Sequence, residues 1–108
     1  MTTLSTHVLD AALGRPAAGL DVVLLDAQRI ELAATATDAD GRVRFADQTL
    51  PGPGTYRLVF ATGPWFAAAA RSTLYPEVEL VFAVTDDQPH YHVALLLSPF
   101  AYTTYRGS

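Results

Sequence analysis

Short runs of β-favouring residues, each closed by glycine, proline or aspartate, follow one another along almost the whole chain. Over residues 3–9, Leu4, Thr6 and Val8 alternate with Ser5, His7 and Leu9, which suggests a strand with a two-residue period. Residues 38–41 read Asp-Ala-Asp-Gly and residues 51–54 read Pro-Gly-Pro-Gly, and both compositions favour tight turns. Short strands separated by frequent turns predict an all-β fold, an antiparallel sandwich with little helix.

The expected strands, roughly seven or eight in number, lie near residues 3–9, 21–28, 29–37, 43–45, 56–61, 78–84, 90–97 and 101–106. One helix is expected over residues 65–71, since alanine favours helices and Pro64 suits a first turn. No internal repeat or linker divides the 108 residues, so we expect one domain spanning residues 1–108.

Composition excludes several classes of partner. The chain has 7 basic and 11 acidic side chains, a net charge of −4, which argues against nucleic acid as a partner. No apolar run approaches the ~20 residues of a membrane span. Cysteine is absent, which excludes thiolate metal sites and a cysteine nucleophile. Because the first residues lack the pattern of a secretory signal, we expect a cytoplasmic protein.

The expected strand 90–97 is unusual because residues 93–97 are all apolar, so that both of its faces are apolar. A strand of this kind is normally covered on both sides. The second cover is either another subunit or a loop lying over a central strand. Phe100, Tyr102 and Tyr105, just beyond the run, favour the subunit.

All three histidines of the chain fall in expected strands. His90 and His92 share a face because they lie two residues apart, and His7 shares a face with Ser5. A histidine on a strand is often structural. Three together also fit a zinc centre with nitrogen ligands, or a metal-free acid–base pair titrating near neutral pH. The spacing leaves both chemistries open.

Arginines and the chain end supply further candidates. Arg42 and Arg44 share a face directly after the 38–41 turn. A guanidinium there can stabilise an oxyanion or bind a planar polar substrate, although a solvated strand face is the simpler interpretation. Tyr105 and Arg106 follow a run that we expect to be buried, so the chain end can be held in place and line a site.

Three segments carry a resemblance to a known family: residues 4–10 (Leu-Ser-Thr-His-Val-Leu-Asp) followed by Gly-Arg-Pro-Ala at 14–17, residues 37–42 (Thr-Asp-Ala-Asp-Gly-Arg), and residues 90–99 (His-Tyr-His-Val-Ala-Leu-Leu-Leu-Ser-Pro) running to the terminal Tyr-Arg-Gly-Ser at 105–108. Together they resemble the 5-hydroxyisourate hydrolases, the transthyretin-like enzymes of purine breakdown. The chain departs from the usual pattern at Ala94, where the family generally has proline.

The resemblance implies a transthyretin (prealbumin)-like sandwich of two four-stranded antiparallel sheets with one short helix. It implies a homotetramer, a dimer of dimers, with sites at the dimer–dimer interface and no cofactor or metal. The implied reaction opens the six-membered ring of 5-hydroxyisourate with water, giving 2-oxo-4-hydroxy-4-carboxy-5-ureidoimidazoline. The catalytic positions fall on His7, Arg42 and His92, and the substrate-binding positions on His7, Arg42, Tyr105, Arg106 and Ser108. His90 belongs to the motif without an assigned role.

Two other functions remain possible at this point. Residues 8–60 also resemble the prealbumin-like modules of larger proteins, which predicts a non-catalytic binding or structural role. The second is a zinc hydrolase that uses His7, His90 and His92 as ligands.

Overall fold

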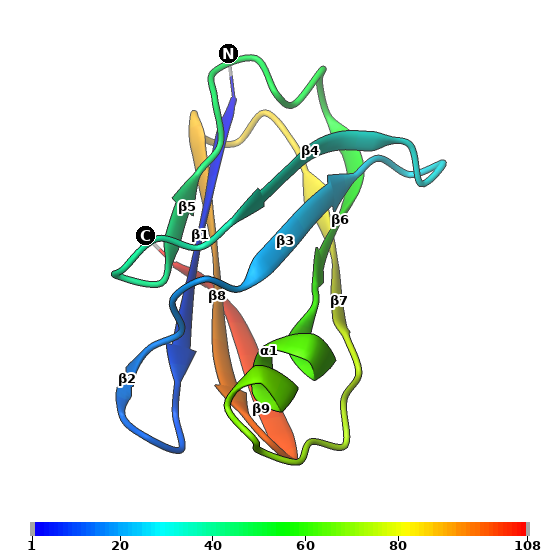
Figure 1. Ribbon diagram of the computed structural model, residues 1–108. Helices are drawn as coiled ribbons and strands as arrows, with labels where there is room; N and C mark the ends of the chain where they lie inside the picture. The colour runs from blue at the N-terminus through cyan, green and yellow to red at the C-terminus, as the bar shows by residue number, and fades with distance from the viewer. Residues whose placement is uncertain (1, 108) are drawn as a thin grey trace.

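The structure, a computed structural model, describes residues 2–107 as two β-sheets packed face to face (Figure 1). The first sheet runs in the order β2 (Arg15–Pro16), β1 (Thr3–Asp10), β8 (His90–Ser98) and β9 (Ala101–Gly107), with β5 (Arg42–Arg44) also paired to β1. The second runs in the order β4 (Glu31–Ala36), β3 (Asp21–Leu25), β6 (Gly54–Phe60) and β7 (Val78–Val84).

The expected sandwich is confirmed, and two details of it are corrected. The first sheet has five strands instead of four, because both β5 and the two-residue β2 pair with β1. The pairing of β1 with β8 is parallel over residues 3–10 and 90–97, whereas every other pair is antiparallel. Strands far apart in sequence are not joined by a hairpin, so nothing local imposes an antiparallel direction on them.

Strand β1 divides its side chains between the core and the outer surface. Its even-numbered residues are buried and its odd-numbered residues are half-buried, as the alternation predicts. Thr6 and Asp10 are the polar residues among the buried positions of β1, and the Thr6 hydroxyl donates a 2.7 Å hydrogen bond to the carbonyl of Val93 on β8. Burying this hydroxyl is therefore tolerated, and it ties β1 to the strand that carries two of the histidines.

The single helix found among residues 2–107, α1 (Thr62–Ala68), begins and ends three residues before the expected 65–71. It lies at one end of the sandwich, on the connection between β6 and β7 (Figure 1). Pro64 is tolerated in its first turn because those N–H groups have no partner within a helix. Ala70 takes a left-handed φ of 56°, which ends the helix. No helix within the described residues is long and apolar enough to cross a membrane.

Candidate active site

The outer face of the first sheet gathers chemistry-bearing side chains from three adjacent strands. In the register, His7 on β1 lies opposite Arg42 on β5. Ser5 lies opposite Arg44 on β5 and opposite His92 on β8. Because alternate residues share a face, the side chains from β1, β5 and β8 meet on the side of the sheet away from the core. This brings together His7, Arg42 and His92, the three residues expected to be catalytic.

The turn before β5 fixes the start of that strand. The Oδ1 atom of Asp38 accepts hydrogen bonds from the N–H groups of Asp40 and Arg42, each at 2.9 Å. Gly41 has a φ of 75°, and a Cβ atom there would lie 2.4 Å from the carbonyl oxygen of Val8. Only glycine fits, for both the backbone angle and the close approach. The Asp-x-Asp-Gly sequence thus places Arg42 beside β1.

The same turn orients the ring of His7. Its Nε2 atom lies 3.0 Å from the carbonyl oxygen of Asp40. A carbonyl oxygen only accepts, so Nε2 must carry the proton and donate it to this bond. In the neutral ring the lone pair is then on Nδ1, which assigns the tautomer of His7 from its partner.

His92 is held from the neighbouring strand. Its Nδ1 atom lies 2.7 Å from the hydroxyl oxygen of Ser5 on β1. Burial lowers the pKa of His92, and the positive charge of Arg42 and the nearby His7 and His90 lower it further. The ring is therefore held neutral at neutral pH, the form in which an imidazole can accept a proton.

A hollow of about 220 Å³ opens beside these groups, lined by Ser5, Thr6, Arg42, Val43, Arg44 and His92. On its β9 side, Gly107 lies directly opposite His92 in the register. A Cβ atom at position 107 would lie 2.4 Å from Cδ2 of the His92 ring. Glycine at this place leaves room for the ring, a role that sequence reasoning did not give to it.

The hydroxyls on β1 are the other residues that sequence reasoning missed. Ser5 was placed on the face of His7 but without a function, and Thr3 was given none. The structure brings both into hydrogen bonds with the histidines of β8. Their two-residue spacing was visible in the sequence, but the pairing of β1 with β8 was not.

The tail residues separate onto two faces of β9. Tyr105 lies opposite Ala94 in the register, on the face of the histidines, while Arg106 lies opposite the core-facing Val93. The Arg106 guanidinium is 4.1 Å from the centre of the Tyr91 ring and pairs with Asp87 at 3.2 Å. Hydrogen bonds from Arg106 and Tyr91 hold the pKa of Asp87 well below its usual range. The structure does not bring Arg106 together with His92, and Ser108 lies outside the described residues.

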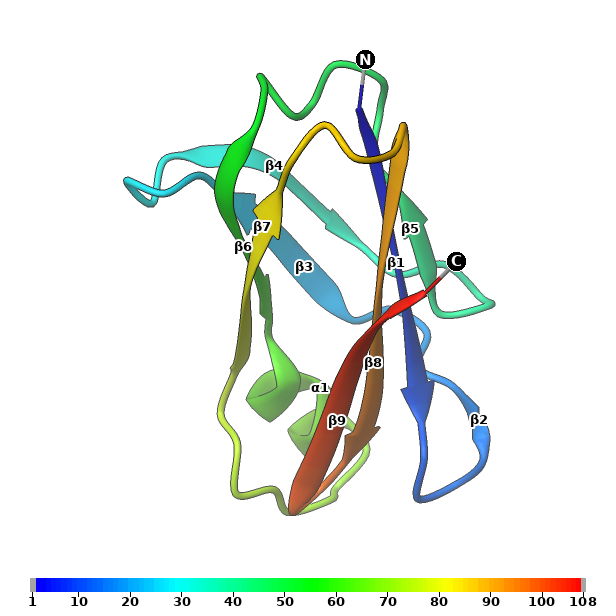
Figure 2. The same ribbon diagram turned by 180° about the vertical axis from the view of Figure 1, so that it is seen from behind.

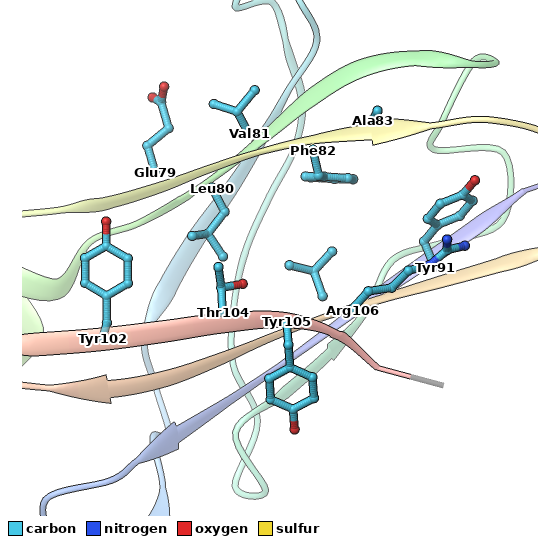
Figure 3. A pocket seen from close by; sticks show the side chains of 11 residues that line it. Glu79, Leu80, Val81, Phe82, Ala83, Tyr91, Tyr102, Thr104, Tyr105 and Arg106 are labelled. Carbon is cyan, nitrogen blue, oxygen red and sulfur yellow. The ribbon is translucent and has the colours of Figure 1, made fainter.

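A larger hollow, of about 380 Å³, lies away from the histidines. It is a groove between the edge strands β7 and β9, which lie at the free edges of the two sheets (Figure 2). Figure 3 shows Arg106 beside Tyr91 at one end of this groove, while the ring of Tyr105 extends from the other side of β9. The hollow near His92 is smaller, but it alone of the two combines a titratable imidazole with two arginines.

The zinc interpretation needs His7, His90 and His92 to converge on one point. Within residues 2–107, no group of three or more His, Asp or Glu side chains is arranged to hold a metal ion. The two ring nitrogens of His90 are both hydrogen-bonded, at 2.6 Å to Thr3 and at 2.8 Å to Ser5. In this arrangement His90 presents no free nitrogen to a metal.

The two-sheet sandwich, with histidines and an arginine on the outer face of one sheet, is the architecture of transthyretin-like proteins. The chain belongs to the HIUase/Transthyretin family, whose model matches residues 4–107. It is 44% identical over 115 residues to the 5-hydroxyisourate hydrolase of Caulobacter vibrioides, covering 100% of both chains.

Solved structures agree with this assignment. The structure of the Klebsiella pneumoniae 5-hydroxyisourate hydrolase matches with a TM-score of 0.90 and 39% identity, covering 100% of both chains. Sea bream transthyretin in complex with thyroxine matches with a TM-score of 0.87 and 31% identity, over 96% of this chain and 93% of that one. A protein named as a hydrolase and a transthyretin solved in complex with thyroxine therefore both resemble this fold, and the site has to distinguish the two functions.

Proposed function

We propose that the protein is a hydrolase that opens the ring of 5-hydroxyisourate in urate catabolism. The observation that carries the proposal is the meeting of His7, Arg42 and His92 on one outer face, from three different strands. The full-length similarity to proteins named 5-hydroxyisourate hydrolase supports the same substrate.

The residues on this face suit the attack of water on a ring carbonyl. His7 and His92 form the pair that takes a proton from water and returns one to the leaving ring nitrogen. Arg42 binds the planar polar ring and stabilises the negative charge that develops on the carbonyl oxygen. Within residues 2–107 its guanidinium forms no ion pair, so its charge is available to a substrate.

The tail completes the proposed pocket. Tyr105 is on the face of His92 and can reach substrate there, and Ser108 is proposed to close the pocket as the resemblance implies. Arg106 can bind substrate only if its guanidinium leaves Asp87 and Tyr91, since both lie on the other face of β9. In the conformation described, Arg106 anchors the end of β9.

We propose a homotetramer, a dimer of dimers, with the sites at the dimer–dimer interface. The outer face of β8 supports this arrangement, since Ala94 and Leu96 continue the surface beyond His92 with apolar side chains. β8 is also a central strand flanked by β1 and β9, which accounts for part of the burial of Ala94. The assembly would cover the remainder and exclude water around the substrate.

The test is an ultraviolet assay of 5-hydroxyisourate produced in place by urate oxidase. Wild-type protein should hasten the disappearance of the compound beyond its spontaneous decay. His92→Asn should lower kcat by about 10²–10⁴-fold, the range for loss of a general acid or base. The controls are the reaction without protein and a circular dichroism spectrum showing that the variant is folded.

Two outcomes would contradict the proposal. If wild-type protein leaves the spontaneous decay unchanged, the chain is not this enzyme, and a binding module becomes the working hypothesis. If untagged protein contains stoichiometric zinc and loses activity to a chelator, the metal-free mechanism is wrong.

A further inference from the structure

Two hydroxyls and two imidazoles alternate in an unbroken hydrogen-bonded chain on the outer face of the first sheet. Thr3 Oγ1 lies 2.6 Å from Nδ1 of His90, and Nε2 of His90 lies 2.8 Å from Oγ of Ser5. The same Ser5 oxygen lies 2.7 Å from Nδ1 of His92. This series of hydrogen bonds thus leads from Thr3, at the start of β1, to His92, whose imidazole borders the hollow.

The parallel register of β1 and β8 produces this alternation. Thr3 lies opposite His90, and Ser5 lies opposite His92. Each hydroxyl can therefore reach imidazoles on the neighbouring strand, and Ser5 reaches both. The four side chains are all half-buried, so water competes with these hydrogen bonds less than it would on an open surface.

The donor and acceptor in each of these hydrogen bonds follow from the bond at Thr3, the end furthest from His92. The hydroxyl of Thr3 has an acceptor in the carbonyl of Pro89, at 3.4 Å, so it can donate there and accept from Nδ1–H of His90. A neutral His90 then has its lone pair on Nε2, which accepts the proton of Ser5. With its own proton committed to His90, the Ser5 oxygen accepts from Nδ1–H of His92.

We propose that Ser5, His90 and Thr3 are positioning residues that hold His92 with its proton on Nδ1 and its lone pair on Nε2. Within residues 2–107, Nε2 of His92 has no hydrogen-bond partner, so the lone pair is left for a water molecule or a substrate. When Nε2 takes a proton from water, the ring becomes positive and the Nδ1–H bond to Ser5 strengthens. The motif histidine His90 then acts on the reaction only through Ser5.

The surrounding charge favours the same arrangement. The titratable or charged groups on the face of His92 are His7 on β1, Arg42 and Arg44 on β5, Tyr105 on β9, and His90 on its own strand. None of them is a carboxylate. Positive charge beside the open side of the ring disfavours a proton there, whereas the hydroxyl of Ser5 accepts one on the other side.

The first test reads the tautomer directly and does not depend on activity. In protein labelled with ¹⁵N at histidine, two-bond ¹⁵N–¹H spectra at pH 7.5 should show His92 protonated at Nδ1 and unprotonated at Nε2. In Ser5→Ala this preference should be lost, and Ser5→Thr, which keeps the hydroxyl, should restore it. A wild-type ring protonated at Nε2, or at both nitrogens, would overturn the inference.

The second test rests on the proposed hydrolase activity. Ser5→Ala should lower kcat by about 10–100-fold with little change in KM, the usual cost of losing a partner that orients a functional histidine. Ser5→Thr should recover most of the rate. Ser98→Ala is the matched control, because Ser98 lies on the same outward face of β8 without a side-chain hydrogen bond in the described chain, and it should leave kcat unchanged.

A double-mutant cycle then asks whether His90 acts through Ser5. His90→Phe should lower kcat by about 3–10-fold in the wild-type background and have no further effect in Ser5→Ala. If the two losses in kcat multiply in the double variant, His90 does not act through Ser5 and the inference is overturned. Wild-type protein without activity but with the expected tautomer would count against the proposed function while supporting the inference.

Discussion

Arginines lie on the outer faces of both sheets, and Arg57 on the second sheet differs from Arg42 on the first in its partners. On the second sheet, Arg57 pairs with Glu79 at 2.8 Å, and Arg29 reaches the same carboxylate at 2.9 Å from the turn between β3 and β4. On the first sheet, Arg42 pairs with no carboxylate within residues 2–107, and two histidines lie near it. A charge that is neutralised within the fold contributes to stability, whereas one left unpaired beside a hollow is available to a ligand. The residue type alone does not distinguish these two uses.

The largest expected effect on activity comes from replacing the unpaired arginine, Arg42, and comparing it with the paired Arg57. Arg42→Ala should lower kcat/KM by about 100-fold or more, since one oxyanion donor typically contributes ~3 kcal/mol to transition-state binding. Arg57→Ala, on the paired face, should leave turnover near the wild-type value. The ultraviolet assay measures both, on protein whose assembly has been checked by gel filtration. Near-normal turnover of Arg42→Ala in a normal assembly would remove Arg42 from the mechanism.

A smaller effect is expected from the close approach of Gly107 to His92. Gly107→Ala places a methyl group against the ring, and displacing the ring should lower kcat by about 10-fold, because small misplacements of a catalytic group are costly. Gly52→Ala is the matched control, since a Cβ atom there meets nothing within 4 Å. Equal rates for the two variants would show that the ring tolerates displacement.

Breaking the ion pairs of Glu79 with Arg29 and Arg57 should change the stability of the protein and not its activity. Glu79→Gln leaves Arg29 and Arg57 without their carboxylate, which should reduce the free energy of unfolding by about 1 kcal/mol. Glu77→Gln, at an exposed position, should change it little. Urea unfolding measures the difference, and the rate of hydrolysis should be unchanged in both variants.

The pH dependence of that difference sharpens the comparison. A hydrogen bond from Arg29, followed by one from Arg57, lowers the pKa of Glu79 below the ordinary 4.5 despite the opposing effect of burial. The native state therefore binds this proton less readily than the unfolded chain. The stabilisation is present above pH 4.5 and is lost as the pH falls through the lowered pKa, so wild type and Glu79→Gln should converge in acid. If the difference in unfolding free energy between wild type and Glu79→Gln persists at acid pH, the lost stability comes from packing and not from the ion pairs.

Tyr105 and Arg106 are separated by a signal that the sequence itself contains. Both were expected to bind substrate, yet consecutive residues of a strand point to opposite faces, so a rigid strand cannot direct both into one pocket. The structure places Tyr105 with the histidines and Arg106 with Asp87 and Tyr91. The alternation was sufficient to separate them once residues 101–106 were expected to form a strand.

By itself the sequence determined the sandwich, the face that each strand residue takes, and the candidates His7, Arg42 and His92. The sandwich and the faces depend on local quantities, namely the two-residue period and the turn chemistry of residues 38–41. The three candidates are what the resemblance of the chain's motifs to a known family implies. Only the tertiary structure decided that β1 and β8 run parallel and that Ser5 lies between His90 and His92. Those contacts join residues more than 80 positions apart. They are set by the packing of the whole sandwich, because no local period of the chain specifies which strand pairs with which or in what register.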